Sequence, residues 1–201
     1  MRITYVEKTG RKKVRVTMDD GESFVVSERD WESFGGKAGE DLEDELILKL
    51  YREYMLPRAK FRALNLLKVR DRSRQELAQR LKMDGYPESI IKDTMAYVDS
   101  YHYLDDARFA RNYVDYRGSR KSRRELEYEL KMKGIDLRSA AEADEYLELP
   151  DDRETIQSIL AKRWGSDMEP DPKEKERMMR YLGRRGFRGG DILYVYKKLG
   201  I

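Results

Sequence analysis

The residues that could carry catalytic or metal chemistry are two pairs of adjacent acids and one histidine. The pairs are Asp105-Asp106 and Asp151-Asp152, and the only histidine is His102. Adjacent side chains on a helix point about 100° apart, and no histidine or third acid converges on either pair from a nearby motif. We interpret both pairs as helix N-caps and not as metal ligands. His102, between two tyrosines, is interpreted as a surface or half-buried packing residue and not as a catalytic group.

The composition also argues against catalysis. The chain contains no cysteine, which excludes disulfides and thiolate metal sites. One histidine cannot build a metal site or a catalytic triad by itself, and no segment resembles a phosphate-binding loop. We predict a protein that is not an enzyme and that holds no metal and no cofactor.

Positive charge, in contrast, is concentrated in clusters. The net charge is only +3, so attraction to a polyanion must come from local clustering. Tyr113, Tyr116 and Tyr128 lie near the central cluster and could stack on bases, although their helical spacing favours core positions. The candidate binding residues are Arg70, Arg72, Arg74, Arg117, Arg120, Lys121, Arg123, Arg124, Arg184, Arg185 and Arg188.

The elements that must position these residues are repeats. A phrase of Leu, three residues, Gly and a large apolar residue occurs at Leu81–Tyr86, Leu130–Ile135 and Leu182–Phe187, with glycines 49 and 52 residues apart. A glycine just past a helix adopts the left-handed conformation, and the next residue packs back on the leucine. Each phrase therefore predicts a helix C-terminus closed by an apolar clasp, and three copies indicate a repeat architecture.

Each phrase is extended on both sides. Ser73 with Glu76, and Ser122 with Glu125, match the capping box, and Asp171-Pro172 predicts a third capped helix that starts a turn earlier. A further helix is expected after each glycine. Its apolar pairs would be Ile91 and Val98, Ala140 and Leu147, and Ile192 and Leu199. A unit is therefore helix, capped helix, helix.

The repeat predicts where the basic clusters lie. The first two clusters recur at the same point of the repeat, in the loop before the capped helix. Stacked units place equivalent loops in a row, so we predict a basic stripe along one edge. Its target would be an acidic protein groove, DNA phosphates or a composite of both, and the alternative is an ordinary solvated surface.

Residues 1–34 have a different pattern, in which β-branched and polar residues alternate. Turns at Thr9-Gly10 and Asp20-Gly21 predict three strands, and Ser27 begins a short helix that carries Trp31 and Phe34 on one face. This element is too small to be stable without packing on the helices.

The chain becomes helical from Asp41. Pro57 is expected to end or kink the first long helix at Leu56. The next helix is expected to run to Val69, with Phe61, Leu64 and Leu67 facing inward.

The expected fold is mainly all-α: an elongated array of three tandem three-helix units with a small N-terminal β element. The 40% charged residues fit helices that have one buried stripe and a wide solvated face. The predicted segments are the β-hairpin or three-stranded element with its short helix at 1–40, a linking helix at 41–56, and three-helix units at 57–104, 105–150 and 151–201. Residues 165–172 are expected to be an insertion in the third unit.

Several phrases, taken in order, resemble the RecX family of recombinase regulators. They are Ser73–Leu77, Tyr103–Ala110, Arg123–Leu126 and Gly134-Ile135. Two positions depart from the family pattern: His102 replaces a glycine, and Arg120-Lys121 replaces a Gly-Pro pair. The resemblance covers essentially the whole chain and implies a bent array of three three-helix units.

The resemblance also implies a function. It implies a regulatory protein that binds the RecA–DNA filament in its helical groove and inhibits or modulates recombinase, ATPase and coprotease activity, within DNA repair, homologous recombination and the SOS response. The alternatives are a stand-alone DNA-binding protein that uses the same stripe, for single- or double-stranded DNA, and an unrelated helical scaffold. The N-terminus does not resemble a signal peptide, and no apolar run approaches membrane-spanning length. We expect a cytoplasmic monomer with no membrane contact.

Overall fold

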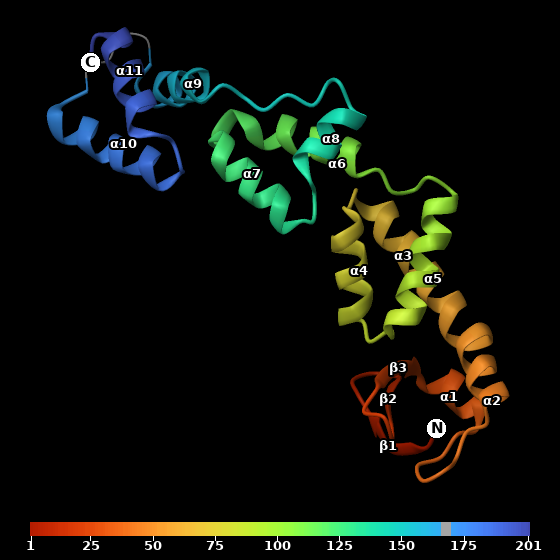
Figure 1. Ribbon diagram of the computed structural model, residues 1–201. Helices are drawn as coiled ribbons and strands as arrows, with labels where there is room; N and C mark the ends of the chain where they lie inside the picture. Colours follow the sequence, from red (N-terminus) through yellow and green to blue (C-terminus); the bar gives the residue numbers. More distant parts are fainter. Residues whose placement is uncertain (166–169) are drawn as a thin grey trace. The chain divides into compact units, whose positions relative to one another are not determined.

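The computed structural model describes residues 1–165 and 170–201 of the chain. Residues 166–169 of the predicted insertion lie outside the described residues. The chain divides into two compact units, Met1–Asp105 and Asp106–Ile201 (Figure 1). The five segment boundaries derived from the sequence stay a prediction.

A three-stranded antiparallel sheet begins the first unit. Strands β1 (Ile3–Lys8), β2 (Lys13–Met18) and β3 (Ser23–Ser27) are ordered β1-β2-β3. Every second residue of β2 is buried, as the alternation predicted. Gly10 and Gly21 stand in the two turns with φ of 68° and 85°, where residues other than glycine are strained. The predicted strands and turns are confirmed.

The helices that follow the sheet correct one expectation. Helix α1 (Glu28–Phe34) begins at Ser27, whose Oγ accepts the Asp30 N–H at 3.1 Å. Helix α2 (Asp44–Lys49), the π-helical segment η1 (Leu50–Met55) and α3 (Leu56–Val69) then follow without a break. Pro57 therefore does not end the helix, and the alternative expectation, a kink at Leu56, stays a prediction. The Leu56 N–H bonds to the Tyr51 carbonyl, five residues back, and this wider turn precedes the proline, which has no N–H.

The inward face of α3 also differs from the prediction. Phe61 is 67% exposed, whereas Ala59 and Ala63 are fully buried and Leu66 is nearly so. Leu64 and Leu67 are partly buried, as expected. Helix α3 packs against α5 (Glu88–Ser100), and small alanine side chains let two helices approach closely. The prediction was therefore wrong for Phe61, because the fully buried positions on either side of it are alanines.

The N-terminal element has no separate core. Its buried residues form one apolar cluster with Leu50, Met55, Ala59 and Ile90 of the helices. The ends of β3 and α4 (Arg74–Met83) lie side by side (Figure 1). The Val25 N–H donates to the Gly85 carbonyl at 2.9 Å, and a Cβ added at Gly85 would lie 2.4 Å from a Val25 methyl. The expected dependence of the strands on the helices is therefore seen directly in their packing.

The three predicted helix triplets are present, so the chain is mainly helical with a small sheet. The first triplet is α3, α4 and α5. The second consists of α6 (Asp106–Arg117), α7 (Arg123–Met132) and α8 (Leu137–Ala143), with the short 3₁₀ segment η2 (Gly118–Arg120) between α6 and α7. The third consists of α9 (Asp152–Trp164), α10 (Pro172–Arg184) and α11 (Gly189–Leu199).

All three apolar clasps are formed. Gly85, Gly134 and Gly186 have φ of 93°, 76° and 82°. The N–H of the following residue reaches the carbonyl of the leucine five positions back, at 3.2, 3.0 and 3.2 Å in chain order. This is the 6→1 hydrogen bond of a Schellman motif, and all three leucines are fully buried. The clasp prediction is confirmed.

The predicted caps are formed as well. Ser73 and Ser122 each accept the N–H of the glutamate three residues on at 3.1 Å. Asp171 accepts the Glu174 N–H at 2.8 Å, and α10 begins one turn earlier than α4 and α7 relative to its glycine, as expected.

One of the three downstream pairs is not as predicted. Helix α8 ends at Ala143, so Leu147 is buried from the segment after the helix and not from its face. Leu199 is 41% exposed in the last turn of α11. Leu147 therefore does not share a helix face with Ala140, whereas Ile192 and Leu199, seven residues apart on α11, do, as do Ile91 and Val98 on α5. No helix in the described part of the chain is long and apolar enough to cross a membrane.

Candidate functional site

The acidic pairs occupy helix starts. Asp151 accepts the Arg153 and Glu154 N–H groups at 2.7 and 3.4 Å, which confirms it as the cap of α9. Asp152 accepts the Arg123 N–H at 2.7 Å. Helix α6 begins at Asp106, where a cap pair was expected. Within residues 1–165 and 170–201, no three His, Cys, Asp or Glu side chains are grouped to hold a metal.

His102 has a backbone role. Its φ is +56°, and the Tyr103 N–H reaches the Val98 carbonyl at 3.1 Å, which is again the 6→1 bond. His102 therefore stands where the other clasps place glycine. A Cβ in the left-handed region costs about 1–2 kcal/mol, so glycine would fit this position with less strain.

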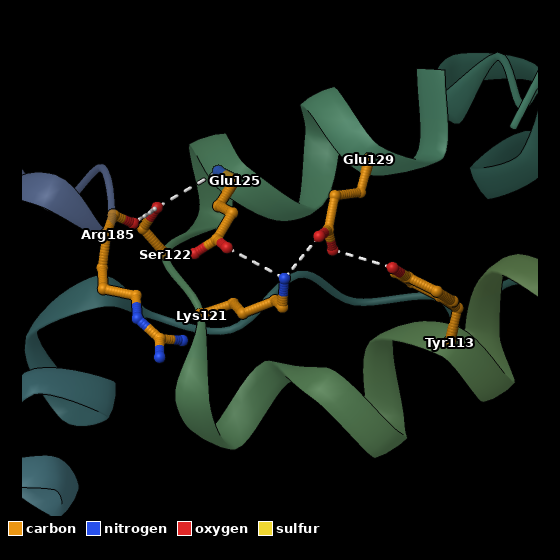
Figure 2. A network of polar contacts seen from close by, with 6 residues as sticks. All are labelled: Tyr113, Lys121, Ser122, Glu125, Glu129 and Arg185. Atoms are coloured by element: carbon orange, nitrogen blue, oxygen red, sulfur yellow. Dashed lines mark hydrogen bonds and ion pairs between the residues drawn. The ribbon is translucent and has the colours of Figure 1, made fainter. Parts of the chain in front are cut away.

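Lys121, in contrast to the stripe prediction, is not available to a partner. The residue is 7% exposed and its ammonium contacts Glu125 Oε1 at 2.9 Å and Glu129 Oε1 (Figure 2). Tyr113 donates to the other Glu129 oxygen at 2.7 Å. Burial alone would raise the pKa of Glu129, but the bonds from Lys121 and Tyr113 outweigh it and lower that pKa. Lys121 is thus a structural cation, and its place in the stripe is corrected.

The cap of α7 also holds the third triplet. Ser122 Oγ donates to the Arg185 carbonyl at 2.8 Å while it accepts from Glu125 N (Figure 2). A Cβ on Gly186 would lie 2.8 Å from Ser122 Oγ, so only glycine fits this contact without a shift. The Arg185 guanidinium lies 5.2 Å from the centre of the Tyr181 ring. Arg185 is half-buried, and both its carbonyl and its guanidinium take part in packing contacts.

Three candidate arginines come together in the second unit. Arg123, Arg124 and Arg188 line a cleft of about 680 Å³ that also contains Arg153. Carboxylates share this cleft: Arg123 pairs with Glu127 at 3.0 Å and Arg153 with Asp191 at 2.7 Å. Burial raises the pKa of Asp152 there, and the Asp191 and Asp151 charges add to the effect. The cleft therefore combines four exposed arginines with four carboxylates, and its formal charges balance.

The other candidates are distributed around these contacts. Arg117 and Arg120 are exposed, and the Arg117 guanidinium lies 5.6 Å from the centre of the Tyr116 ring. Arg70 and Arg74 are exposed, and Arg74 pairs with Asp99. Arg72 is half-buried, and its Nε has no hydrogen-bond acceptor among the described residues. Burial, with the Arg70 charge, lowers the pKa of Arg72.

The nearby tyrosines are divided between surface and core. Tyr116 is 80% exposed and Tyr128 is 64% exposed, so the core interpretation of these two is wrong. Tyr113 is partly buried against the Phe109 ring, as the core interpretation required.

Arg184 belongs to a different cleft, which the sequence analysis missed. This cleft, of about 490 Å³, lies between α9 and α10, and Lys162, Arg163 and Arg177 line it together with Arg184. The signal was present in the sequence. Arg177 and Arg184 are seven residues apart and so share one helix face.

The fold places the chain among proteins built from tandem three-helix domains, and comparisons identify the family. Family models for the first, second and third three-helix domains of RecX match residues 59–97, 105–143 and 151–196. A regulatory protein RecX of Serratia proteamaculans is 32% identical over 162 residues, 68% of this chain and 94% of the relative. The chain belongs to the RecX family.

Other relatives match more of the length. A regulatory protein RecX of Clostridium tetani is 24% identical over 200 residues, 96% of this chain and 91% of the relative. A crystal structure of regulatory protein RecX covers 99% of this chain and 98% of its own, with a TM-score of 0.55 and 18% identity. A RecX structure from Lactobacillus salivarius covers 72% and 96%, with a TM-score of 0.56 and 22% identity. These two likenesses concern the fold alone.

Proposed function

We propose that this protein binds a RecA-type recombinase filament on DNA, in the helical groove of the filament, and restrains its recombinase, ATPase and coprotease activity as a cytoplasmic monomer. Family membership supports this proposal, since the relatives carry the name regulatory protein. The observation that carries it is the group of exposed arginines at the start of α7, Arg120, Arg123 and Arg124, with Arg188 across the same cleft from the last two.

The chemistry of this surface suits a polyanionic assembly. Arginine presents a planar fork of donors that matches carboxylate and phosphate oxygens. Cations at the rim of a binding surface mainly accelerate association and fix register, and many modest contacts supply the rest of the affinity. The paired carboxylates within the cleft keep the arginines oriented. They also weaken the binding of isolated small anions.

The experiment is charge reversal at three positions: Arg120→Glu, Arg123→Glu and Arg124→Glu. Lys121 is left unchanged because it is buried between two glutamates. We expect affinity for the recombinase–DNA filament to fall at least about tenfold and to lose much of its salt dependence, with thermal stability little changed. Filament ATP turnover and strand exchange, with and without the variant, report the loss of restraint.

The matched control reverses three exposed cations elsewhere in the same unit, at Arg138, Lys173 and Lys197. It should retain nearly all of the effect on the filament. Equal loss in both triple variants would show that net charge and not this surface is recognised. The proposal would be contradicted if the variant with glutamate at positions 120, 123 and 124 still restrained filament ATP turnover and strand exchange fully.

The second candidate function is a stand-alone DNA-binding protein that uses the same arginines, which the exposure of Arg120 and Arg124 also favours. The two functions differ in their preferred target. Affinity for bare DNA as high as for the recombinase–DNA filament, in one buffer, would favour the second candidate.

A further inference from the structure

The first unit contains a cleft rich in positive charge beside the N-terminal sheet. It measures about 600 Å³, and the β1–β2 turn forms one wall while α3 and α4 form the other. The turn contributes Arg11, Lys12 and Lys13, and the helices contribute Arg58, Arg62 and Arg80. The match to the first RecX domain begins only at residue 59. The sheet wall therefore lies outside the three domains that define the family.

The charges on the helix wall are held by ion pairs. Asp30 contacts Arg58 at 2.8 Å, and Asp84 contacts Arg62 at 2.6 Å and Arg80 at 3.6 Å. Both carboxylates are about 15% exposed, whereas the arginines are 37–56% exposed. Six cations stand against two carboxylates, so the cleft keeps an excess of four positive charges. The carboxylates fix the arginines and leave their outer donors to solvent.

The cations of the turn wall are differently placed. Arg11, Lys12 and Lys13 make no ion pair within the described part of the chain. Lys12 has φ +59°, and its carbonyl accepts the Glu28 N–H at 3.0 Å, which ties the turn to the start of α1. Three uncompensated charges are therefore held on a short, anchored turn.

The helix wall also carries an aromatic ring whose exposure packing does not explain. Phe61 lines the cleft and is 67% exposed, while Ala59 and Ala63 on either side of it are buried. Arg58, Phe61, Arg62 and Asn65 lie three or four residues apart and so share one helix face. An exposed ring among cations and an amide is the surface on which unpaired bases stack.

We propose that this cleft binds a single strand of nucleic acid, with phosphates on the turn cations and Arg80, and a base stacked on Phe61. A duplex hides the faces of its bases within the stack, and an acidic peptide has no base to cover the ring, so a single strand fits this combination best. The proposal goes beyond both functions proposed above, because it assigns a single strand to another cleft, with which the arginines at the start of α7 share no residue.

The test measures binding of the full chain to a fluorescein-labelled oligothymidine of about 15 nucleotides by anisotropy, without recombinase. Arg11→Ser, Lys12→Gly and Lys13→Thr together remove the turn charges. Glycine suits the left-handed position and threonine suits a strand, so the sheet should remain folded. We expect at least about tenfold weaker binding and a salt slope reduced by about two, as for three lost phosphate contacts. Phe61→Ala should weaken binding roughly tenfold with the salt slope unchanged.

Matched controls separate the cleft from general charge and exposure. Lys49→Gln, Arg52→Gln and Lys92→Gln remove three exposed cations from the same unit, and Tyr146→Ala removes a ring that is 71% exposed in the other unit. Both should bind as the unmodified chain does. Tighter binding of a duplex of equal length, or equal binding of a polyglutamate peptide, would overturn the proposal in favour of those partners. So would absence of binding to the free strand, whatever the effect on the filament.

Discussion

The loops before α4 and α7 have the same sequence pattern and cap geometry, but the charges around their cations differ. Each has a cation, a buried serine cap and a glutamate three residues after the cap: Arg72, Ser73 and Glu76 in the first triplet, and Lys121, Ser122 and Glu125 in the second. One turn further along, the first helix has Arg80 and the second has Glu129. A single position of the repeat therefore changes sign between the two triplets.

The pKa directions follow that change. Burial would lower the pKa of Lys121, but its bonds to Glu125 and Glu129 outweigh burial and raise it. Burial lowers the pKa of Arg72, and the charges of Arg70, Arg80 and Arg62 add to this, against Glu76 alone. The second triplet thus neutralises its loop cation, and the first accumulates positive charge. The residue seven positions after the serine cap therefore decides whether the loop cation is available to a partner. A carboxylate there, as at Glu129, pairs with the cation, whereas an arginine, as at Arg80, does not.

The largest expected loss of stability concerns the apolar clasp, which the two triplets share. Leu81→Ala and Leu130→Ala each remove a fully buried clasp side chain, so each should reduce the free energy of unfolding by about 2–5 kcal/mol. Denaturant titration would measure this. The two tryptophans, Trp31 in the first unit and Trp164 in the second, can each be kept alone to follow one unit. A large cost in one triplet with none in the other would show that the clasps are not equivalent.

The next effect should separate the triplets. Lys121→Glu places a third carboxylate beside Glu125 and Glu129, and we expect a loss of about 3 kcal/mol. Arg72→Glu at the equivalent position adds an acid near Arg62, Arg70 and Arg80, so its cost should stay below about 1 kcal/mol. Each variant is followed by the tryptophan of its own unit. Equal costs would contradict the electrostatic difference.

The pH dependence of the Lys121 cluster should be smaller. The lowered pKa of Glu129 contributes stability above the unfolded value near 4.5, which is lost as pH falls through the folded pKa. The raised pKa of Lys121 contributes stability below 10.5, which is lost as pH rises through the folded pKa. Lys121→Met should therefore lose about 1–2 kcal/mol between these limits and approach the unmodified chain outside them. Unfolding free energies measured across this pH range would test it, and a constant difference would contradict the assignment.

The smallest change in stability should come from placing in the first triplet the acid that the second triplet has at Glu129. Arg80→Glu gives Arg72 a second carboxylate, as Lys121 has, but loses the contact with Asp84 at 3.6 Å. These two changes oppose each other, so stability should change by less than about 0.5 kcal/mol. Calorimetry of the full chain would detect a larger shift, and a loss above 1 kcal/mol would mean that Arg80 has a structural role.

Short-range sequence patterns were enough to predict the repeat and the ends of its helices. Each clasp and serine cap depends on residues within six positions of one another, so spacing alone predicted them. The availability of each charge depends on contacts across helices. Lys121 could be recognised as buried only once Glu129 and Tyr113 are known to converge on it from α7 and α6. The exposure of Phe61 could likewise not be predicted from local spacing. It depends on which face of α3 packs against α5, and the buried residues of α3 include Ala59 and Ala63.

The cleft of the first unit could not be foreseen for a related reason. Arg11–Lys13 and Arg80 are nearly seventy residues apart in the sequence, and nothing in either segment predicts that they share a cleft. The His102 turn, in contrast, was within reach. Its spacing to Val98 matches that of the glycine clasps, but the absence of glycine hid it.

The contact between Val25 and Gly85 also sets the order of events at the ribosome. The strands are made first, but β3 completes its backbone bonding through the Gly85 carbonyl and its core includes Ile90. At about 5–20 residues per second, translation needs several seconds to proceed from the third strand to that partner. During this interval the β-rich segment is an unfinished nascent chain whose apolar face is open to chaperones. Its folding must await the helix ending made sixty residues later.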